Sequence, residues 1–116
     1  MPSAAVQLKA LQRRQRQLAS QILELGFVQQ GTVVRRHTYC QTPGCRCHAD
    51  PPRPHGPYWQ WTRYDSGKTI TRRLDERQAR TYQELMDNRR RLAEIIAELE
   101  TIGAQAAELL LQQNDA

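Results

Sequence analysis

The sequence is short of the residues that build a large core. Of its 116 residues 39% are hydrophobic and 6% are aromatic, with a single Phe. A chain this poor in apolar residues does not form a thick core, so thin helix–helix contacts or a bound metal must supply stability. No run of 18 apolar residues occurs, which excludes a membrane-spanning helix.

Two further features are missing. The first twenty residues, MPSAAVQLKALQRRQRQLAS, are interrupted by charged residues and Gln, so they lack the apolar region of a secretory signal, and we expect a cytoplasmic protein. A glycine-rich phosphate-binding loop is also missing, which disfavours a nucleotide-dependent enzyme. Only three cysteines are present. An odd number in a reducing compartment favours thiolates over disulfides.

Charge is unevenly distributed along the chain. Residues 32–91 carry thirteen Lys or Arg against six Asp or Glu, a net charge of +7. Residues 92–116 carry no Lys or Arg and five acidic residues, a net charge of -5. A basic middle segment beside an acidic end favours a polyanionic partner for the middle of the chain.

The periodicity predicts a helix at each end of a mainly α chain. Within 4–26, apolar residues recur in steps of three and four, with Gln15 as the one polar position and Gly26 as the C-cap. In 75–112, Asp75 and Gln78 form a capping-box pattern before a long heptad-like stripe, which Ile96 and Leu110 widen. These helices are predicted to form a coiled coil or helical bundle, either with each other or with a second chain as a homodimer.

The segment 32–74 is predicted to form a small β element. Thr32, Val33 and Val34 are a short β-prone run, and the stretches YWQWTRY and KTITRRL flank a DSG turn in which Gly67 takes a left-handed conformation. Alternation places Tyr58, Gln60, Thr62 and Tyr64 on one face of the first arm and Trp59, Trp61 and Arg63 on the other. We expect one domain over 1–116.

All three cysteines lie between these elements, in YCQTPGCRCHADPPRPHGPYWQW. Cys40, Cys45, Cys47 and His55 supply three thiolates and one imidazole, a full tetrahedral set for one zinc ion. Gly44 permits a tight turn before Cys45. Such a four-ligand site is structural rather than catalytic, and we expect no enzymatic activity.

Other interpretations of this cluster stay open. His48 competes with His55 for the fourth position, although a ligand directly after Cys47 would strain a tetrahedral site, and His37 is a third choice. A thiolate nucleophile paired with a histidine would make the chain an enzyme. Oxidation of Cys45 and Cys47 with loss of zinc would make it a redox switch.

Basic and aromatic residues surround the cluster. Arg and Lys neutralise phosphates, and aromatic rings stack on bases, while a two-stranded ribbon fits the major groove of DNA. We therefore predict a nucleic-acid-binding surface, with DNA as the favoured ligand, made of Arg35, Arg36, Tyr58, Trp61, Arg63, Lys68, Arg72 and Arg73. The competing interpretation is that the tryptophans form the small core.

These residues resemble an uncharacterised family of short bacterial and archaeal proteins, over roughly residues 32–100. Its signature is Cys-Gly-Lys-Pro-x-Cys-x-Cys followed by His-Gly-Pro-Tyr and a Gly-Lys hairpin. The positions that match are Cys40, Pro43, Cys45, Cys47, His55, Gly56, Pro57, Tyr58, Gly67 and Lys68, whereas Gln41 and Thr42 replace the family's Gly-Lys. The resemblance implies a gene setting near transposases and other mobile-element genes.

Two functional hypotheses follow from the sequence. The first is a zinc-binding, nucleic-acid-binding accessory protein of a mobile element. The second is a coiled-coil interaction or assembly module in which a structural zinc only stiffens the tip and no nucleic acid binds.

Overall fold

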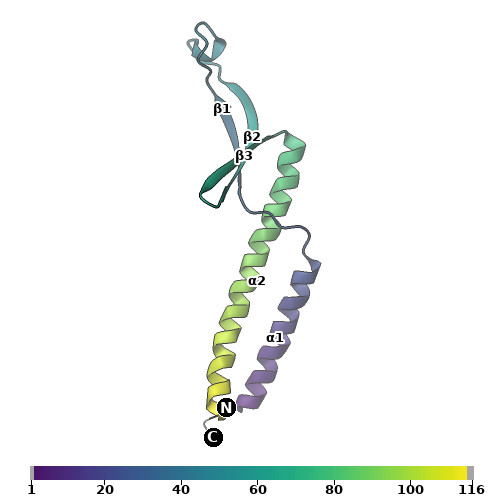
Figure 1. The fold of residues 1–116 in the computed structure, drawn as a ribbon. Coiled ribbons are helices and arrows are strands. Elements are labelled where there is room, and N and C mark those ends of the chain that lie inside the picture. Colours follow the sequence, from purple (N-terminus) through teal and green to yellow (C-terminus); the bar gives the residue numbers. More distant parts are fainter. Residues whose placement is uncertain (1, 115–116) are drawn as a thin grey trace. The chain divides into compact units, whose positions relative to one another are not determined.

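The structure, a computed structural model, describes residues 2–114. Its elements follow the order α1 (Ala4–Glu24), β1 (Thr32–Thr38), η1 (Arg46–His48), β2 (His55–Asp65), β3 (Lys68–Leu74) and α2 (Glu76–Asn114) (Figure 1). None of the described helices is long and apolar enough to cross a membrane. Asp115, part of the acidic end, lies outside the described residues.

The described chain forms two compact units. The helical unit contains residues up to 28 and from 88 onward, and the sheet unit contains residues 29–87. The long helix α2 therefore contributes its first turns to the sheet unit and its remaining residues to the helical unit.

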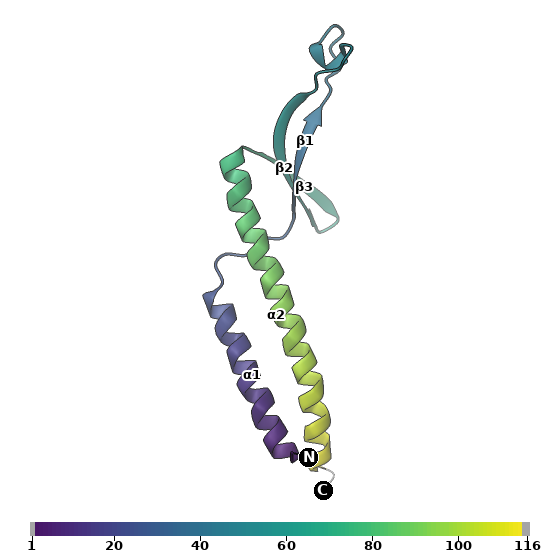
Figure 2. The same cartoon turned by 180° about the vertical axis from the view of Figure 1, so that it is seen from behind.

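In the helical unit, α1 and the later part of α2 run side by side and antiparallel, as both views show (Figures 1 and 2). Leu18 and Ile95 are fully buried, and Ile102 joins them. Partly buried apolar residues complete this core: Leu11, Ile22, Leu25 and Leu99. The predicted heptad seams thus pair within one chain, while Gln15 is exposed to solvent.

The end of α1 differs from the prediction. The helix stops at Glu24, and the cap is Leu25, which has an extended backbone and donates its N–H to the carbonyl of Ile22. Because Leu25 packs on the helical core in this conformation, no left-handed glycine is required, and Gly26 lies beyond the cap.

The sheet is antiparallel with strand order β1-β2-β3, so β2 is central. The predicted hairpin of β2 and β3 is confirmed, and Ser66 and Gly67 in its turn both have positive φ, as in a type I′ turn. The strand β1 is longer than the predicted run and pairs with β2 from Thr32↔Thr62 to Arg36↔Tyr58. Its second half carries charged, exposed side chains, which hid it from a hydrophobic pattern.

Paired residues on neighbouring strands share a face, so the register defines two faces of the sheet. The helix face packs on the first turns of α2, and its core contains Val33, Trp59, Trp61, Leu74, Ala79, Tyr82 and Met86. We call the opposite side the open face; the register assigns to it Thr32, Val34, Arg36, Tyr58, Gln60, Thr62, Tyr64, Thr69, Thr71 and Arg73. The predicted alternation along β2 agrees with this division.

A capping box joins the sheet to α2. The Asp75 carboxylate accepts a hydrogen bond from the N–H of Gln78 at 2.8 Å, and the Gln78 side chain accepts one from the N–H of Asp75 at 2.9 Å. Since Asp75 directly follows β3, this reciprocal pair satisfies two otherwise unpaired donors and starts the helix at Glu76. The predicted N-terminus of the long helix is therefore confirmed, one residue inside its expected start.

Candidate metal centre and nucleic-acid surface

The strands of the sheet unit bring the ends of the cysteine-rich loop together. Cys40 lies two residues beyond β1, and His55 is the first residue of β2. The register places Thr38 opposite His55 after a local irregularity, so both ligands lie at the same end of the β1–β2 pair. Between them the loop folds back through the short helix η1, which contains Cys47 and follows Cys45 directly.

The four predicted ligands form one cluster. The ligand atoms of Cys40, Cys45, Cys47 and His55 all lie within 4.8 Å of one another. The Sγ atoms of Cys40 and Cys47 are 3.5 Å apart, and Sγ of Cys45 is 3.3 Å from Nε2 of His55. A tetrahedral zinc site with normal bond lengths has ligand–ligand distances of roughly 3.5 to 3.8 Å. The donor set and these distances are compatible with a bound metal ion.

The other two histidines lie outside this cluster. His48 is exposed, and its Nε2 contacts the carbonyl oxygen of Cys40, to which it must donate because a carbonyl only accepts. His37 is an exposed residue of β1. The structure thus groups His55, rather than either alternative, with the three thiols.

The surroundings of the thiols differ. Hydrogen bonds, first from the Thr42 backbone and then from His55 and the two other cysteines, lower the pKa of Cys40 to about 6. This favours the thiolate, the form that binds metals, at neutral pH. Burial raises the pKa of Cys47, which is 1% exposed. A cation would compensate for keeping this buried sulfur ionised.

Two glycines shape the loop beside the ligands. Gly44, the glycine of the turn predicted before Cys45, has φ of 76° and thus a left-handed conformation. Gly56, with φ of 104°, follows His55 directly, and a Cβ atom there would lie 2.9 Å from the carbonyl oxygen of Arg36. A side chain at Gly56 would therefore push β2 away from β1 at the point where His55 is positioned.

The eight predicted nucleic-acid-binding residues divide between the two faces of the sheet. The register puts Arg36, Tyr58 and Arg73 on the open face. It puts Arg35, Trp61, Arg63 and Arg72 on the helix face. Lys68 lies opposite Asp65 in the register, beside the turn. The alternation along β2 predicted that Tyr58 lies on the face opposite Trp61 and Arg63. The sequence did not show the register of β1 and β3, which assigns the remaining residues to the two faces.

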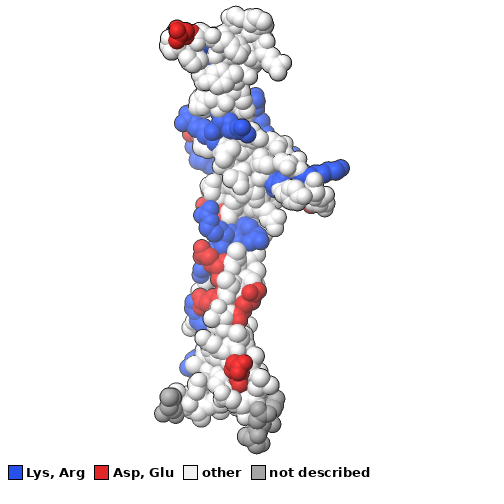
Figure 3. All heavy atoms as spheres, turned by 90° about the vertical axis from the view of Figure 1, so that its left-hand side faces the viewer, with Lys and Arg blue, Asp and Glu red and all other residues white. Residues whose placement is uncertain are grey.

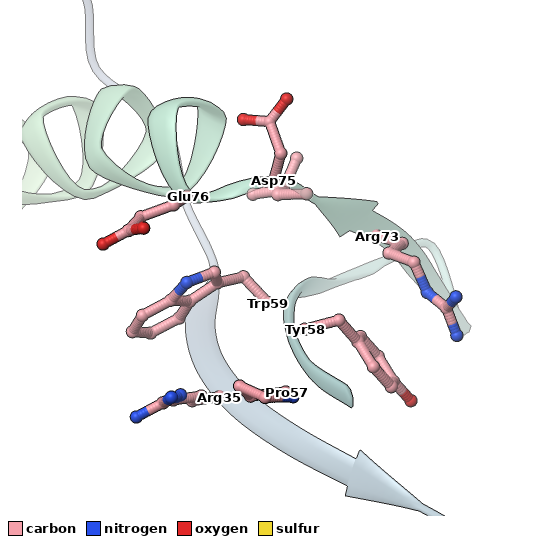
Figure 4. A pocket seen from close by; sticks show the side chains of 8 residues that line it. Arg35, Pro57, Tyr58, Trp59, Arg73, Asp75 and Glu76 are labelled. Atoms are coloured by element: carbon pink, nitrogen blue, oxygen red, sulfur yellow. The ribbon is translucent and has the colours of Figure 1, made fainter. Parts of the chain in front are cut away.

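On the open face, Tyr58 and Arg73 form a stacked pair. The guanidinium carbon of Arg73 lies 3.9 Å from the centre of the Tyr58 ring. Both line a hollow of about 650 Å³ at the end of the sheet where β2 begins and β3 leads into α2. Figure 4 shows Tyr58 and Arg73 on one side of β2, and Trp59, Arg35 and Glu76 on the other. The hollow therefore has an arginine and an aromatic ring on each side of the strand.

Trp61 is corrected from a surface residue to a core residue. It is 4% exposed, its ring packs edge-on against Tyr82 with centroids 5.3 Å apart, and its Nε1–H donates to the carbonyl of Gln30. Arg63 lies over the same ring at 5.9 Å and pairs with Asp65. A buried ring cannot stack on a base, so Trp61 stabilises the sheet unit instead.

Tyr64, which belongs to the predicted aromatic and basic hairpin, is 72% exposed on the open face. The period-two alternation of β2 already placed it on the same face as Tyr58. In the view of Figure 3, Lys and Arg gather over the strands, whereas both acidic and basic side chains lie over the helices. The uneven charge of the sequence is therefore visible on this surface.

Fold and site together define a small antiparallel sheet with a Cys₃His group that can bind a metal ion; in the sequence, one helix precedes the sheet and another follows it. Over residues 8–84 the chain matches a family described as a domain of unknown function, DUF6788. This is more than half of the chain, which therefore belongs to that family. The matched range includes most of α1, unlike the range of the sequence resemblance. No curated protein and no solved structure matches the chain.

Proposed function

We propose that the protein is a small zinc-binding, nucleic-acid-binding accessory protein. The observation that carries this proposal is the composition of the open face. Its described strand residues include Arg36 and Arg73 together with tyrosines, threonines and one glutamine, and the register assigns no carboxylate to it. Such a surface offers cations to phosphates, rings to bases and hydroxyl groups to both.

Zinc is the metal of this proposal. Three thiolates and an imidazole suit zinc, and the distances within the cluster support a tetrahedral ion. Cys40, Cys45, Cys47 and His55 would hold it and would tie the end of β1 to the start of β2. Four protein ligands leave no coordination position for water or substrate, so the proposal includes no catalytic step.

The proposal also gives the protein a setting, as an accessory factor of a mobile genetic element. The resemblance of the Cys/His motif to proteins encoded near transposases supports this setting. Mobile elements need proteins that bind their nucleic acid, and the basic sheet unit is suited to that task. We expect such a protein to act in the cytoplasm.

A salt-dependent binding titration tests the proposal. Binding of the zinc-loaded full chain to labelled single-stranded and duplex DNA is measured by fluorescence anisotropy over a range of salt concentrations. If phosphates are neutralised, affinity falls steeply with salt, and Arg36→Gln and Arg73→Gln each reduce the slope by about one. Arg13→Gln, an exposed arginine of α1, is the matched control and leaves the slope unchanged.

Absence of binding to either DNA at low salt would reject the proposal. An equal loss of slope in Arg13→Gln and in the two sheet variants would also reject it, because the open face would then have no special role.

A second candidate function is assembly through the helices. Ile96 and Leu110, which widen the stripe on α2, are 42% and 49% exposed beside α1, and Leu23 and Phe27 are more exposed still. A second copy of the chain would cover such apolar residues. We therefore also propose a homodimer through the helical unit.

Sedimentation analysis checks this second proposal. The double variant Ile96→Gln with Leu110→Gln is expected to shift the protein from dimer to monomer. Glu100→Gln, which lies off the stripe, is the control and leaves the dimer intact. A parent protein that sediments as a monomer at every concentration would contradict the dimer.

A further inference from the structure

We propose that the open face binds single-stranded nucleic acid by base stacking and does not enter the groove of a duplex. This inference rests on the proposed function and names its ligand class. The stacking positions are Tyr64 and the Tyr58–Arg73 pair.

Tyr64 has the surroundings of a stacking residue. It is 72% exposed and lies opposite Thr69 on the open face, away from the core of the sheet unit. A large ring held on a strand and open to solvent costs little to order and presents a flat π surface. Every nucleic-acid base also has a flat π surface, so such a ring stacks on bases with little sequence preference.

Tyr58 and Arg73 offer a second position with a charge. The guanidinium carbon of Arg73 lies over the ring of Tyr58, 3.9 Å from its centre. A guanidinium in this position can stack on a base with its free face, and its N–H groups can donate hydrogen bonds to a phosphate. The pair therefore combines the two interactions that binding of a single strand requires.

The region between the two positions suits unpaired bases. Tyr64 lies six positions after Tyr58 in β2, which is about 20 Å along a strand. The open-face side chains between them are Gln60 and Thr62, whose nitrogen and oxygen lie 3.5 Å apart. Amide and hydroxyl groups both donate and accept hydrogen bonds, so they can pair with exposed base edges. The length fits a site of about four nucleotides.

The width of the three-stranded sheet argues against binding in the groove of a duplex. A two-stranded ribbon fits the major groove, which is about 12 Å wide. The observed sheet has three strands, and its outer strand axes lie about 10 Å apart before their side groups are added. With only two arginines assigned to it, the open face also has few partners for the closely spaced phosphates of a duplex.

Fluorescence anisotropy with two labelled probes tests the inference. One probe is oligothymidine of about twelve nucleotides, and the other is a duplex of equal length. We expect the zinc-loaded full chain to bind oligothymidine at least about fivefold more tightly, and Tyr64→Ala to weaken this binding by at least about fivefold. The salt slope stays unchanged, because a ring contributes no charge. Tyr64→Phe retains binding.

Tyr39→Ala is the matched control, since Tyr39 is also exposed but precedes the metal ligands outside the strands. It is expected to bind as the parent does. Zinc content and far-ultraviolet circular dichroism confirm that each variant is folded. Equal affinity for the duplex, or full binding by Tyr64→Ala, overturns the inference and leaves the proposed function standing. Failure of the parent to bind either probe overturns both.

Discussion

The two units of this protein reach stability by different means. In the helical unit, Leu18 and Ile95 are fully buried between two helices, and apolar neighbours surround them. In the sheet unit, an apolar core lies only on the helix face, around Trp61. In the loop of residues 39–54, Cys47 is the one buried residue. Apolar packing therefore accounts for the stability of the helices and of one face of the sheet, but not for the ordered conformation of this loop.

The difference shows how a short chain compensates for a small core. Loops without apolar side chains lose conformational entropy on folding with little burial to offset it. A metal ion held by Cys40, Cys45, Cys47 and His55 would supply the missing free energy, because binding to a site that forms only on folding stabilises the fold. The helical unit needs no such ion. Substitutions in one unit at a time test this difference between the units.

The largest effect is expected from loss of a metal ligand. Cys47→Ser should disorder residues 39–54 and weaken the pairing of β1 with β2, since a structural ligand contributes folding free energy. The resonances of the helical unit should stay in place. Amide NMR spectra of parent and variant measure both effects.

His48→Ala is the control for this change. His48 lies in the same loop but outside the cluster, so its variant should retain the metal and the ordered loop. A Cys47→Ser protein with an unchanged loop spectrum would show that the loop folds without a metal and would remove the contrast between the units.

A smaller but clear effect is expected in the helical unit. Ile95→Ala leaves a cavity at a fully buried position and should cost about 2 to 5 kcal/mol of unfolding free energy. The neighbouring Ile96→Ala removes the same atoms from a partly exposed position and should cost far less. Chemical denaturation followed by circular dichroism at 222 nm measures both. Equal losses would mean that the helices pack differently.

The smallest effect is expected where the sheet meets the long helix. Asp75→Ala removes the acceptor for the N–H of Gln78 and should lower stability by about 1 kcal/mol. Asp75→Asn keeps a side-chain oxygen and should restore most of the loss. Thermal unfolding of the three proteins compares them. Equal melting temperatures for the alanine variant and the parent would argue against the cap.

The helical unit could be predicted from the sequence in most of its detail. Steps of three and four residues placed Leu18, Ile95 and Ile102 on facing seams, and all three are buried. Periodicity did not decide between pairing within a chain and pairing between chains, because both bury the same stripe. The cap at Leu25 was also missed, since an extended backbone at that position leaves no sequence signal.

In the sheet unit, the sequence predicted the β2–β3 hairpin and the Cys/His cluster. It did not predict that β1 pairs with this hairpin. Aromatic and β-branched residues predicted β2 and β3, and the cysteine spacing predicted the cluster with His55. The second half of β1 contains Arg35, Arg36 and His37, which are in a strand because β1 pairs with β2 rather than through a strong β preference of their own. The alternation along β2 separated Trp61 from Tyr64, but it did not show that the face with Trp61 is the one that packs on α2.

The metal content of the purified chain tests the central claim most directly. Native mass spectrometry of the parent should show one zinc ion per chain, lost in Cys45→Ser and retained in His37→Ala, a histidine outside the cluster. Loss of zinc should be accompanied by loss of β1–β2 cross-strand contacts in NMR spectra. A parent without bound metal, whose cross-strand contacts survive treatment with a chelator, would contradict the account.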